Sequence, residues 1–218
     1  MVDIHKIIDD TGIISIMMER NQLVGILQYL HYVLDKNIPG DIVELGCNVG
    51  TTSILIRKLL DLYGSDKKYH VYDSWDGLPN VTNKDLSKTQ WKFKRGSCKT
   101  SKDIFIKNFT DRNLKLPIIH SGWFKDIPDK EYPEKICFAF FDGDFYTSII
   151  DSFNKTYHKM HKGGIILIDD CGWNVLPGVE LACNDFLKDK EEELYLTGYP
   201  DKNNIYGASN KGGIIFKK

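Results

Sequence analysis

Short apolar segments that stop at a glycine or an acidic residue alternate along this chain with segments of helical periodicity. The apolar segments cover residues 41–46, 68–72, 116–120, 136–141 and 164–168, and the helical pattern covers residues 51–62, 101–109, 147–161 and 179–187. Near-continuous apolar strands need both faces covered, and strands that alternate with helices are typical of a parallel sheet between helical layers. The chain is therefore predicted to be an α/β protein with a doubly wound, mostly parallel sheet.

The last part of the chain departs from this alternation. Residues 193–197 and 213–216 are strand candidates joined by a polar loop that has no helical pattern. Parallel neighbours need a long crossover connection, whereas antiparallel neighbours do not. We therefore expect a C-terminal antiparallel hairpin, which brings the predicted sheet to seven strands.

Size and composition limit the classes of protein to consider. The chain has 218 residues, the size of one domain or of one domain with an extension. Its formal net charge of -1 gives no overall basic field for nucleic acid or an anionic membrane. Its five cysteines are widely spaced without a CxxC pair, which argues against a disulfide framework and a zinc finger. Without a signal-peptide core or an apolar run near the ~18 residues of a membrane span, we expect a cytoplasmic protein with no membrane or nucleic-acid partner.

The N-terminal region also carries apolar residues at helical spacing. Between residues 11 and 36 the pattern predicts a helix whose apolar face is Ile16, Leu23, Leu27, Leu30, Val33 and Leu34. Pro39-Gly40 then interrupts the pattern. We predict a single domain over residues 1–218, with a helical extension over residues 1–38 and an α/β core over residues 39–218. The extension either packs on the core or forms the contact of a homodimer.

Polar and acidic residues collect where the predicted strands end. The groups are Glu44 with its glycine turn, Asp73-Ser74, Gly122-Trp123, Asp142-Gly143-Asp144 and Asp169-Asp170. In an open parallel α/β sheet, ligands bind beyond the carboxyl ends of the strands. The order of these groups therefore predicts one binding site along that edge of the sheet.

The first of these groups is a glycine-rich turn between a strand and a helix, with the sequence ELGCNVGT over residues 44–51. Glycine lets the backbone approach a ligand and take a positive φ, and Asn48 tolerates the left-handed conformation well. A dinucleotide site has the pattern G-x-G-x-x-G, but the corresponding residues here are Gly46, Asn48 and Thr51, which disfavours a nicotinamide oxidoreductase. Acidic residues at the turn and at Asp73 suit a nucleoside that carries an amino-acid group. An ordinary β–α turn with a capping asparagine is the alternative.

Asp142 and the pair Asp169-Asp170 close two consecutive apolar strands. If these strands are neighbours, their axes lie ~4.8 Å apart and the terminal carboxylates can converge on one ion. Hard oxygen ligands without a Cys–His set favour Mg²⁺, Mn²⁺ or Ca²⁺ over zinc. Asp144 either supports this site or caps the helix that begins near Tyr146. Helix capping is also the alternative for the other terminal aspartates.

Five segments carry a more specific resemblance. They are residues 40–50 (GDIVELGCNVG), 71–79 (VYDSWDGLP), 121–128 (SGWFKDIP), 141–148 (FDGDFYTS) and 163–170 (GGIILIDD). Together they resemble the macrocin O-methyltransferase (TylF-like) family of class I S-adenosylmethionine-dependent methyltransferases, which methylates sugar hydroxyls with a divalent metal. The resemblance runs from about residue 11 to about residue 187 and implies a Rossmann-like methyltransferase fold.

The resemblance implies a role for each motif residue. The residues expected at the methionine and ribose part of the cofactor are Glu44, Gly46, Asn48, Gly50 and Thr51. Asp73 is expected to accept the ribose hydroxyls with Ser74 beside it, and Gly122 and Trp123 are expected to flank the adenine. Asp142, Asp169 and Asp170 match the family's metal carboxylates, and Asp142 is also expected at the cofactor. Residues 171–173 depart from the family's usual pattern, which leaves the acceptor open.

The expected function is therefore metal-dependent O-methylation of a sugar hydroxyl in a glycan precursor, a nucleotide sugar or a glycosylated metabolite. Mg²⁺ would orient the hydroxyl and lower its pKa, with Asp169 as both metal ligand and general base. The lysine-rich segment 79–107 is expected to be either a lid with acceptor contacts or a solvated face. His120 and Cys171 are expected to be structural. Two alternatives stay open: a methyltransferase for a non-sugar acceptor, and a non-catalytic protein that binds the cofactor or a glycan.

Overall fold

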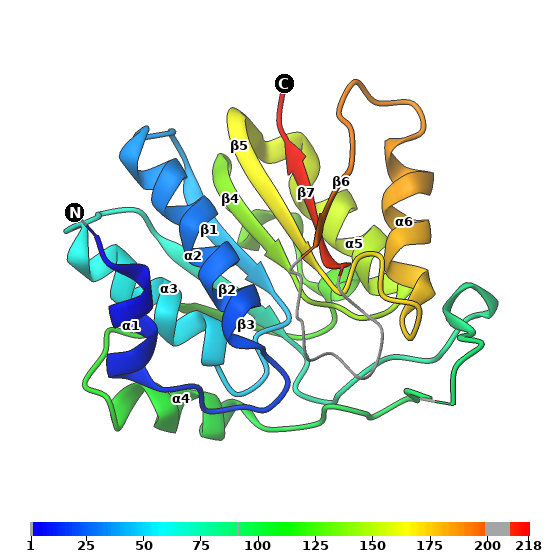
Figure 1. Cartoon of the computed structure of the whole chain (residues 1–218), viewed down its shortest axis with the longest axis horizontal. Helices are drawn as coiled ribbons and strands as arrows, with labels where there is room; N and C mark the ends of the chain where they lie inside the picture. Colours follow the sequence, from blue (N-terminus) through cyan, green and yellow to red (C-terminus); the bar gives the residue numbers. More distant parts are fainter. Residues whose placement is uncertain (1, 91, 199–209) are drawn as a thin grey trace.

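The computed structural model describes residues 2–90, 92–198 and 210–218 and is built around a seven-stranded sheet (Figure 1). The strand order is β3-β2-β1-β4-β5-β7-β6, with bounds β1 Asp41–Leu45, β2 Tyr69–Asp73, β3 Ile118–Ser121, β4 Ile136–Phe141, β5 Met160–Asp169, β6 Tyr195–Gly198 and β7 Asn210–Phe216. β3, β2, β1, β4 and β5 are parallel, whereas β7 is antiparallel to both β5 and β6. The predicted mostly parallel sheet with a C-terminal antiparallel hairpin is confirmed. Most of the loop predicted within that hairpin, residues 199–209, lies outside the described residues.

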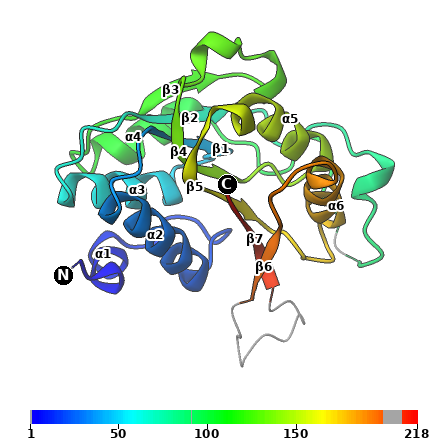
Figure 2. The ribbon, with the colours of Figure 1, turned by 90° about the horizontal axis from the view of Figure 1, so that it is seen from above.

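Helices cover both faces of the sheet (Figure 2). One face carries α1 Ile4–Thr11, α2 Arg20–Asp35, α3 Thr51–Leu62 and α4 Lys102–Thr110, and the other carries α5 Tyr146–Thr156 and α6 Pro177–Leu187. Single 3₁₀ turns lie at Asn83–Asp85, Phe124–Asp126, Asp129–Glu131 and Tyr157–Lys159. Within the described ranges, none of the helices combines the length and the apolar character needed to cross a membrane.

The central strand β4 shows why the strand sequences are apolar without interruption. Its Phe138 and Phe140 pack among the α1–α4 layer, and its Ala139 and Phe141 pack among the α5–α6 layer. Every residue of β4 is buried. A strand covered on both faces has no solvent side on which polar residues would alternate.

The N-terminal extension differs from its prediction. α2 covers only the later part of the helix predicted over residues 11–36, residues 12–19 are not helical, and a separate helix, α1, precedes them. Gly12, with φ +75°, ends α1, and Glu19 starts α2 with a capping box. Five of the six predicted face residues, from Leu23 to Leu34, are buried, but Ile16 is 102% exposed. The prediction for Ile16 is wrong because this residue lies in the connection rather than on the helix.

A second difference concerns the end of the helix predicted over residues 147–161. α5 ends at Thr156, a 3₁₀ turn follows, and β5 begins at Met160. Met160 pairs with Ile136 of β4, so this end of the predicted helix belongs to the sheet. A short run of apolar residues is too short to show a helical or a strand period, so the sequence pattern does not distinguish the end of a helix from the start of a strand.

The connections reverse direction at β1. The chain leaves β1 through α3 to reach β2 and then β3, and afterwards crosses to β4 on the opposite side of β1. α5 then joins β4 to β5 over the other face of the sheet. Such a reversal opens a crevice beyond the carboxyl ends of the strands on either side of it, here β1 and β4.

Candidate active site

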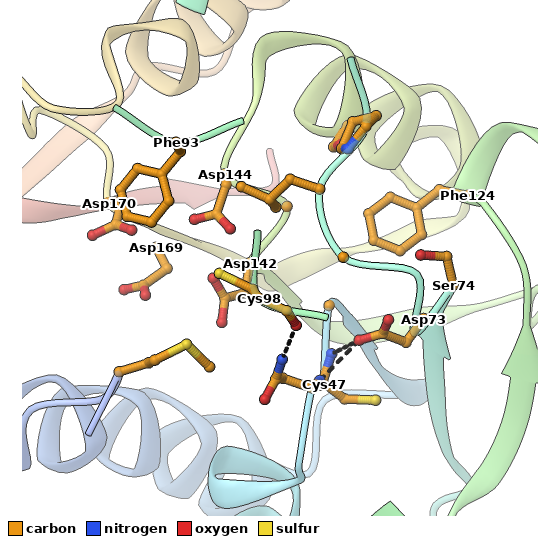
Figure 3. Close-up of a pocket in the computed structure, with 18 of the residues that line it drawn as sticks. Cys47, Asp73, Ser74, Phe93, Cys98, Phe124, Asp142, Asp144, Asp169 and Asp170 are labelled. Carbon is orange, nitrogen blue, oxygen red and sulfur yellow. Dashed lines mark hydrogen bonds between the residues drawn. The ribbon is translucent and has the colours of Figure 1, made fainter. Parts of the chain in front are cut away.

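A cavity of about 870 Å³ lies beyond the carboxyl ends of β1, β2, β4 and β5. Small-molecule sites occupy roughly 300–1,000 Å³, so this volume suits one. The predicted site residues that line it are Glu44, Gly46, Asn48, Thr51, Asp73, Ser74, Gly122, Trp123, Asp142, Asp169 and Asp170. Figure 3 shows Ser74 and Phe124 at one end of the cavity and Phe93 with Asp170 at the other.

Asp73, the last residue of β2, ties the glycine turn to the sheet. Its Oδ2 accepts hydrogen bonds from the backbone N–H groups of Cys47 (2.9 Å) and Asn48 (2.8 Å), and its Oδ1 accepts one from Trp75 N–H (2.7 Å). Burial raises the pKa of Asp73, and these hydrogen bonds oppose that shift. Each carboxylate oxygen can accept more than one hydrogen bond, so Asp73 keeps the capacity to accept a ligand hydroxyl.

The turn has the left-handed backbone that its sequence predicts. The φ angles are +93° at Gly46, +46° at Asn48 and +91° at Gly50. A Cβ on Gly46 would lie 1.9 Å from the carbonyl oxygen of Asp142, so only glycine lets the turn pass the end of β4.

Gly50 does not line the cavity, in contrast to its predicted place at the cofactor. It precedes α3, and a Cβ there would lie 3.0 Å from the ring of Phe105. Gly50 therefore serves the packing of α4 beneath the turn. Its neighbour Thr51 does line the cavity.

Glu44 places a carboxyl group in a deeply buried part of the site. The residue is 1% exposed, and its Oε2 accepts hydrogen bonds from the hydroxyls of Ser53 (2.6 Å) and Tyr69. Desolvation is the main cause that raises the pKa of Glu44 to about 7, while the two hydroxyl groups oppose it. A cationic group in the cavity would stabilise the ionised form of this carboxylate.

Thr51 presents a hydroxyl that pairs with none of the described residues. Its Oγ1 is buried and has no hydrogen-bond partner within the described part of the chain. Buried polar atoms are normally paired. Because Thr51 lines the cavity, this orphaned hydroxyl marks a place where a bound polar ligand fits.

Four aspartates gather at the ends of β4 and β5 (Figure 3). Asp142 and Asp144 follow β4, Asp169 closes β5 and Asp170 comes next. Burial raises the pKa of Asp142 well above its usual range, and the charges of the other three aspartates raise it further. Burial and the charge of Asp170 likewise raise the pKa of Asp169, and they raise the pKa of Asp144 to about 8. The cluster thus contains more carboxyl groups than can all ionise without a compensating cation.

This donor set has the chemistry of a site for a hard divalent cation. Carboxylate oxygens are the ligands that Mg²⁺ takes in proteins, and a cation would offset their mutual repulsion. Across the residues that the structure describes, no three His, Cys, Asp or Glu side chains stand close enough together to hold a metal ion. The site therefore fits a cation by the donor type and charge of Asp142, Asp169 and Asp170. Their side chains do not form a ready coordination sphere in this structure.

Asp144 belongs to the cavity and does not cap α5. The residue before α5, Phe145, makes no side-chain cap, and the N–H of Tyr146 donates instead to Asp85 Oδ1 at 2.7 Å. Asp144 itself lines the cavity with a left-handed backbone, φ +61°. Of the two predicted roles for Asp144, helix capping is wrong.

Gln22 is a cavity residue that the sequence patterns do not indicate. Its Nε2 donates a hydrogen bond to Asp169 Oδ1 at 3.0 Å, across 147 residues of chain. Gln22 is 7% exposed and lies on α2 next to the buried Leu23. A polar residue within the buried face of a helix is the signal that could have pointed to it.

The segment predicted as a lid or a solvated face lies over the cavity. Its residues Pro79, Asn80, Thr82, Phe93, Arg95 and Cys98 line the cavity, and the ring of Phe93 meets the edge of Trp173 at 6.4 Å between centroids. A purely solvated face is therefore wrong for this part of the chain. The last residues of the predicted segment belong to α4.

His120 and Cys171, both expected to be structural, do not line the cavity. His120 stacks on Tyr72 at 4.5 Å between ring centroids and lies 3.0 Å from the ring nitrogen of His70. Cys171 is buried, with its Sγ 3.9 Å from that of Cys183. Both residues occupy packing positions.

Comparison with known proteins gives consistent matches. A family model described as Macrocin-O-methyltransferase (TylF) matches residues 7–197. Demethyldecarbamoylnovobiocin O-methyltransferase of Streptomyces niveus is 29% identical over 160 residues, which cover 71% of this chain and 61% of that protein. The 8-demethyl-8-(2,3-dimethoxy-alpha-L-rhamnosyl)-tetracenomycin-C 4'-O-methyltransferase of Streptomyces olivaceus is 28% identical over 171 residues, 75% of this chain and 62% of that protein.

These matches span about three-fifths of the length of the curated relatives. Among solved structures, the O-methyltransferase NovP shares 26% identity and a TM-score of 0.76, over 93% of this chain and 81% of that chain. The family match includes every predicted site residue from Glu44 to Asp170.

Proposed function

The chain belongs to the macrocin O-methyltransferase (TylF) family, and from this membership and the geometry of the cavity we propose that it transfers the methyl group of S-adenosylmethionine to a hydroxyl of a sugar-bearing small molecule. The observation that carries the proposal is that one cavity contains both the glycine turn anchored by Asp73 and the cluster of aspartates. A methyl donor at the turn and a hydroxyl at the cluster would share that cavity. The rhamnosyl group in the name of the Streptomyces olivaceus relative supports a sugar-bearing acceptor.

The proposed cofactor site uses residues at the turn and at the end of β2. S-adenosylmethionine, when bound, supplies a methyl group already activated on a sulfonium. Asp73 retains acceptor capacity for the ribose hydroxyls, and Thr51 Oγ1 has an unsatisfied place for a polar atom. Glu44 offers a negative charge for the ammonium group of the methionine part, and Ser74 and Trp123 line the part assigned to the adenosine.

We assign Asp142, Asp169 and Asp170 as the residues that would hold Mg²⁺. When bound, the ion supplies a Lewis acid that lowers the pKa of an acceptor hydroxyl. The support is the mutual repulsion of these carboxylates, because the groups that raise the pKa of Asp142, besides burial itself, are all other carboxylates.

Asp169 is proposed as the group that takes the proton from the acceptor hydroxyl. Its Oδ1 is held by Gln22, which leaves its other oxygen for a ligand in the cavity. Asp144 is the second candidate because it lines the same cavity and its carboxylate could accept the proton. Transfer of the methyl group itself then depends on holding the hydroxyl in line with the sulfonium.

Methyl transfer can be tested with radiolabelled S-adenosylmethionine and a panel of nucleotide sugars, rhamnosides and glycosylated metabolites, with catechol as a non-sugar acceptor. We expect labelled product with a sugar-bearing acceptor and none with catechol. Labelling of catechol alone would contradict the sugar assignment. Binding of S-adenosylhomocysteine without turnover on any acceptor would favour the non-catalytic alternative.

The metal and the base are tested in the same assay. Excess chelator should abolish turnover and added Mg²⁺ should restore it, whereas full activity in chelator would exclude the metal role. Removal of the proton acceptor should lower kcat by about 10²–10⁴-fold. Asp169→Asn and Asp144→Asn, compared at saturating Mg²⁺, decide which aspartate accepts the proton.

A further inference from the structure

Gln22 uses both ends of its side-chain amide, and the two ends serve different parts of the molecule. Its Oε1 accepts a hydrogen bond from the backbone N–H of Glu19 at 2.8 Å, within the capping box that starts α2. Its Nε2 donates to Asp169 Oδ1 at 3.0 Å. The bond to Asp169 is shielded from water, since Gln22 is 7% exposed and Asp169 is 8% exposed, whereas the bond to Glu19 is partly buried.

The capping box fixes which end of the amide faces Asp169. An amide has a carbonyl end that only accepts and an NH₂ end that only donates. Because the N–H of Glu19 requires the carbonyl end, the NH₂ end must face β5. A glutamate at this position would also satisfy the capping box but would present an acceptor to Asp169.

We infer that Gln22 is a positioning residue of the active site, which orients Asp169 by holding one of its carboxylate oxygens and leaves the other for ligands in the cavity. The inference rests on the proposed function, since it takes Asp169 as metal ligand and proton acceptor. It makes the N-terminal extension part of the active site. Removing a group that hydrogen-bonds to a metal ligand typically lowers metal affinity or activity by about 10–100-fold, and we expect a loss of this order here.

A purely structural role is the competing explanation, because Gln22 also belongs to a helix cap. Asp3 offers a matched control for that role. Asp3 Oδ1 caps α1 by accepting from the N–H of Lys6 at 3.0 Å, and Asp3 does not line the cavity. Loss of either cap should lower the melting temperature, whereas only the change at Gln22 should alter the site.

The test uses Mn²⁺ as a paramagnetic probe, titrated into the full chain with S-adenosylhomocysteine present and followed by electron paramagnetic resonance. We expect Gln22→Met to weaken Mn²⁺ binding about ten-fold, and Asp3→Ala to leave it unchanged. Affinity for S-adenosylhomocysteine, measured by calorimetry without metal, should stay the same in both variants. In methyl transfer, Gln22→Met should lower kcat about ten-fold without raising the KM for S-adenosylmethionine.

Several outcomes would overturn the inference. If Gln22→Met has the same Mn²⁺ affinity and the same kcat as the unaltered protein, Asp169 needs no positioning by Gln22. An equal loss in Asp3→Ala would show that helix capping explains the effect. If Gln22→Met does not fold, Gln22→Asn keeps the amide but withdraws it by one methylene, and the same losses are expected. Absence of Mn²⁺ binding by the unaltered protein would instead refute the metal part of the proposed function, and the inference with it.

Discussion

Replacing Glu44 by glutamine removes a charge from the buried base of the site while keeping its shape. The carboxylate Oε2 accepts hydrogen bonds from the hydroxyls of Ser53 and Tyr69, and a glutamine carbonyl oxygen can accept the same two. The amide stays neutral at every pH, whereas the carboxylate must ionise without solvent around it. This desolvation is the main reason that the pKa of Glu44 is raised to about 7.

A raised carboxyl pKa means that the folded protein holds this proton more tightly than the unfolded chain does. Between the ordinary value of 4.5 and about 7, the folded state binds more protons, so stability falls as pH rises through this window. The full difference corresponds to roughly 3 kcal/mol. At about pH 5 roughly a quarter of that cost is present, and at about pH 8 nearly all of it is.

Urea unfolding of both proteins at the two pH values measures the effect. Relative to the unaltered protein, we expect Glu44→Gln to gain roughly 2–3 kcal/mol in free energy of unfolding between about pH 5 and about pH 8. Glu191→Gln, at an exposed position, should show no such gain. A difference between Glu44→Gln and the unaltered protein that is the same at both pH values would refute the reasoning. The substitution should also weaken S-adenosylhomocysteine binding, because the charge proposed to meet the ammonium group is lost.

Three further substitutions test the turn, its anchor and the segment over the cavity. Gly46→Ala places a Cβ 1.9 Å from the carbonyl oxygen of Asp142 and should abolish S-adenosylhomocysteine binding in calorimetry. In the control Gly64→Ala, at φ +55°, the new Cβ meets no atom within 4 Å, and binding should stay intact. Equal affinities of the two variants would contradict the steric argument. In the unaltered protein, three backbone N–H groups donate to the two carboxylate oxygens of Asp73. Asp73→Asn keeps only one acceptor oxygen, so its affinity for S-adenosylhomocysteine should fall at least about ten-fold. Asp85→Ala leaves the first N–H of α5 unpaired and should lower the free energy of unfolding by about 2 kcal/mol in urea titrations; an unchanged midpoint would show that water replaces the carboxylate.

The parts of the fold that depend on local pattern are predictable from the sequence. The helix predicted over residues 51–62 and the strand predicted over residues 136–141 coincide with α3 and β4. β4 is apolar throughout because it is fully buried. Position 46 requires glycine because the turn passes close to the carbonyl oxygen of Asp142. The gathering of most predicted site residues around one cavity follows from the parallel sheet, which brings all strand ends to one edge.

The remaining features depend on contacts between distant parts of the chain. The bond between Gln22 and Asp169 joins residues 147 positions apart, and the cap of α5 comes from Asp85, 61 positions before it. Neither partner carries a local pattern that identifies the other. Residues 12–19 continue the apolar content of their surroundings, and the positive φ of Gly12 and the capping box at Glu19 separate the two helices there.

The position of β7 has a consequence for how this chain is synthesised. β7 lies between β5 and β6 in the sheet, although it follows both in the sequence. Until residues 210–216 have left the ribosome, β5 has a free edge along Ile165–Asp169, and β6 has no described strand beside it to pair with. An unpaired apolar strand edge invites association with other chains. A nascent chain stalled before β7 would thus display the strand that carries Asp169 as a template for aggregation, and slow translation of the segment that contains β7 should increase the demand for chaperones.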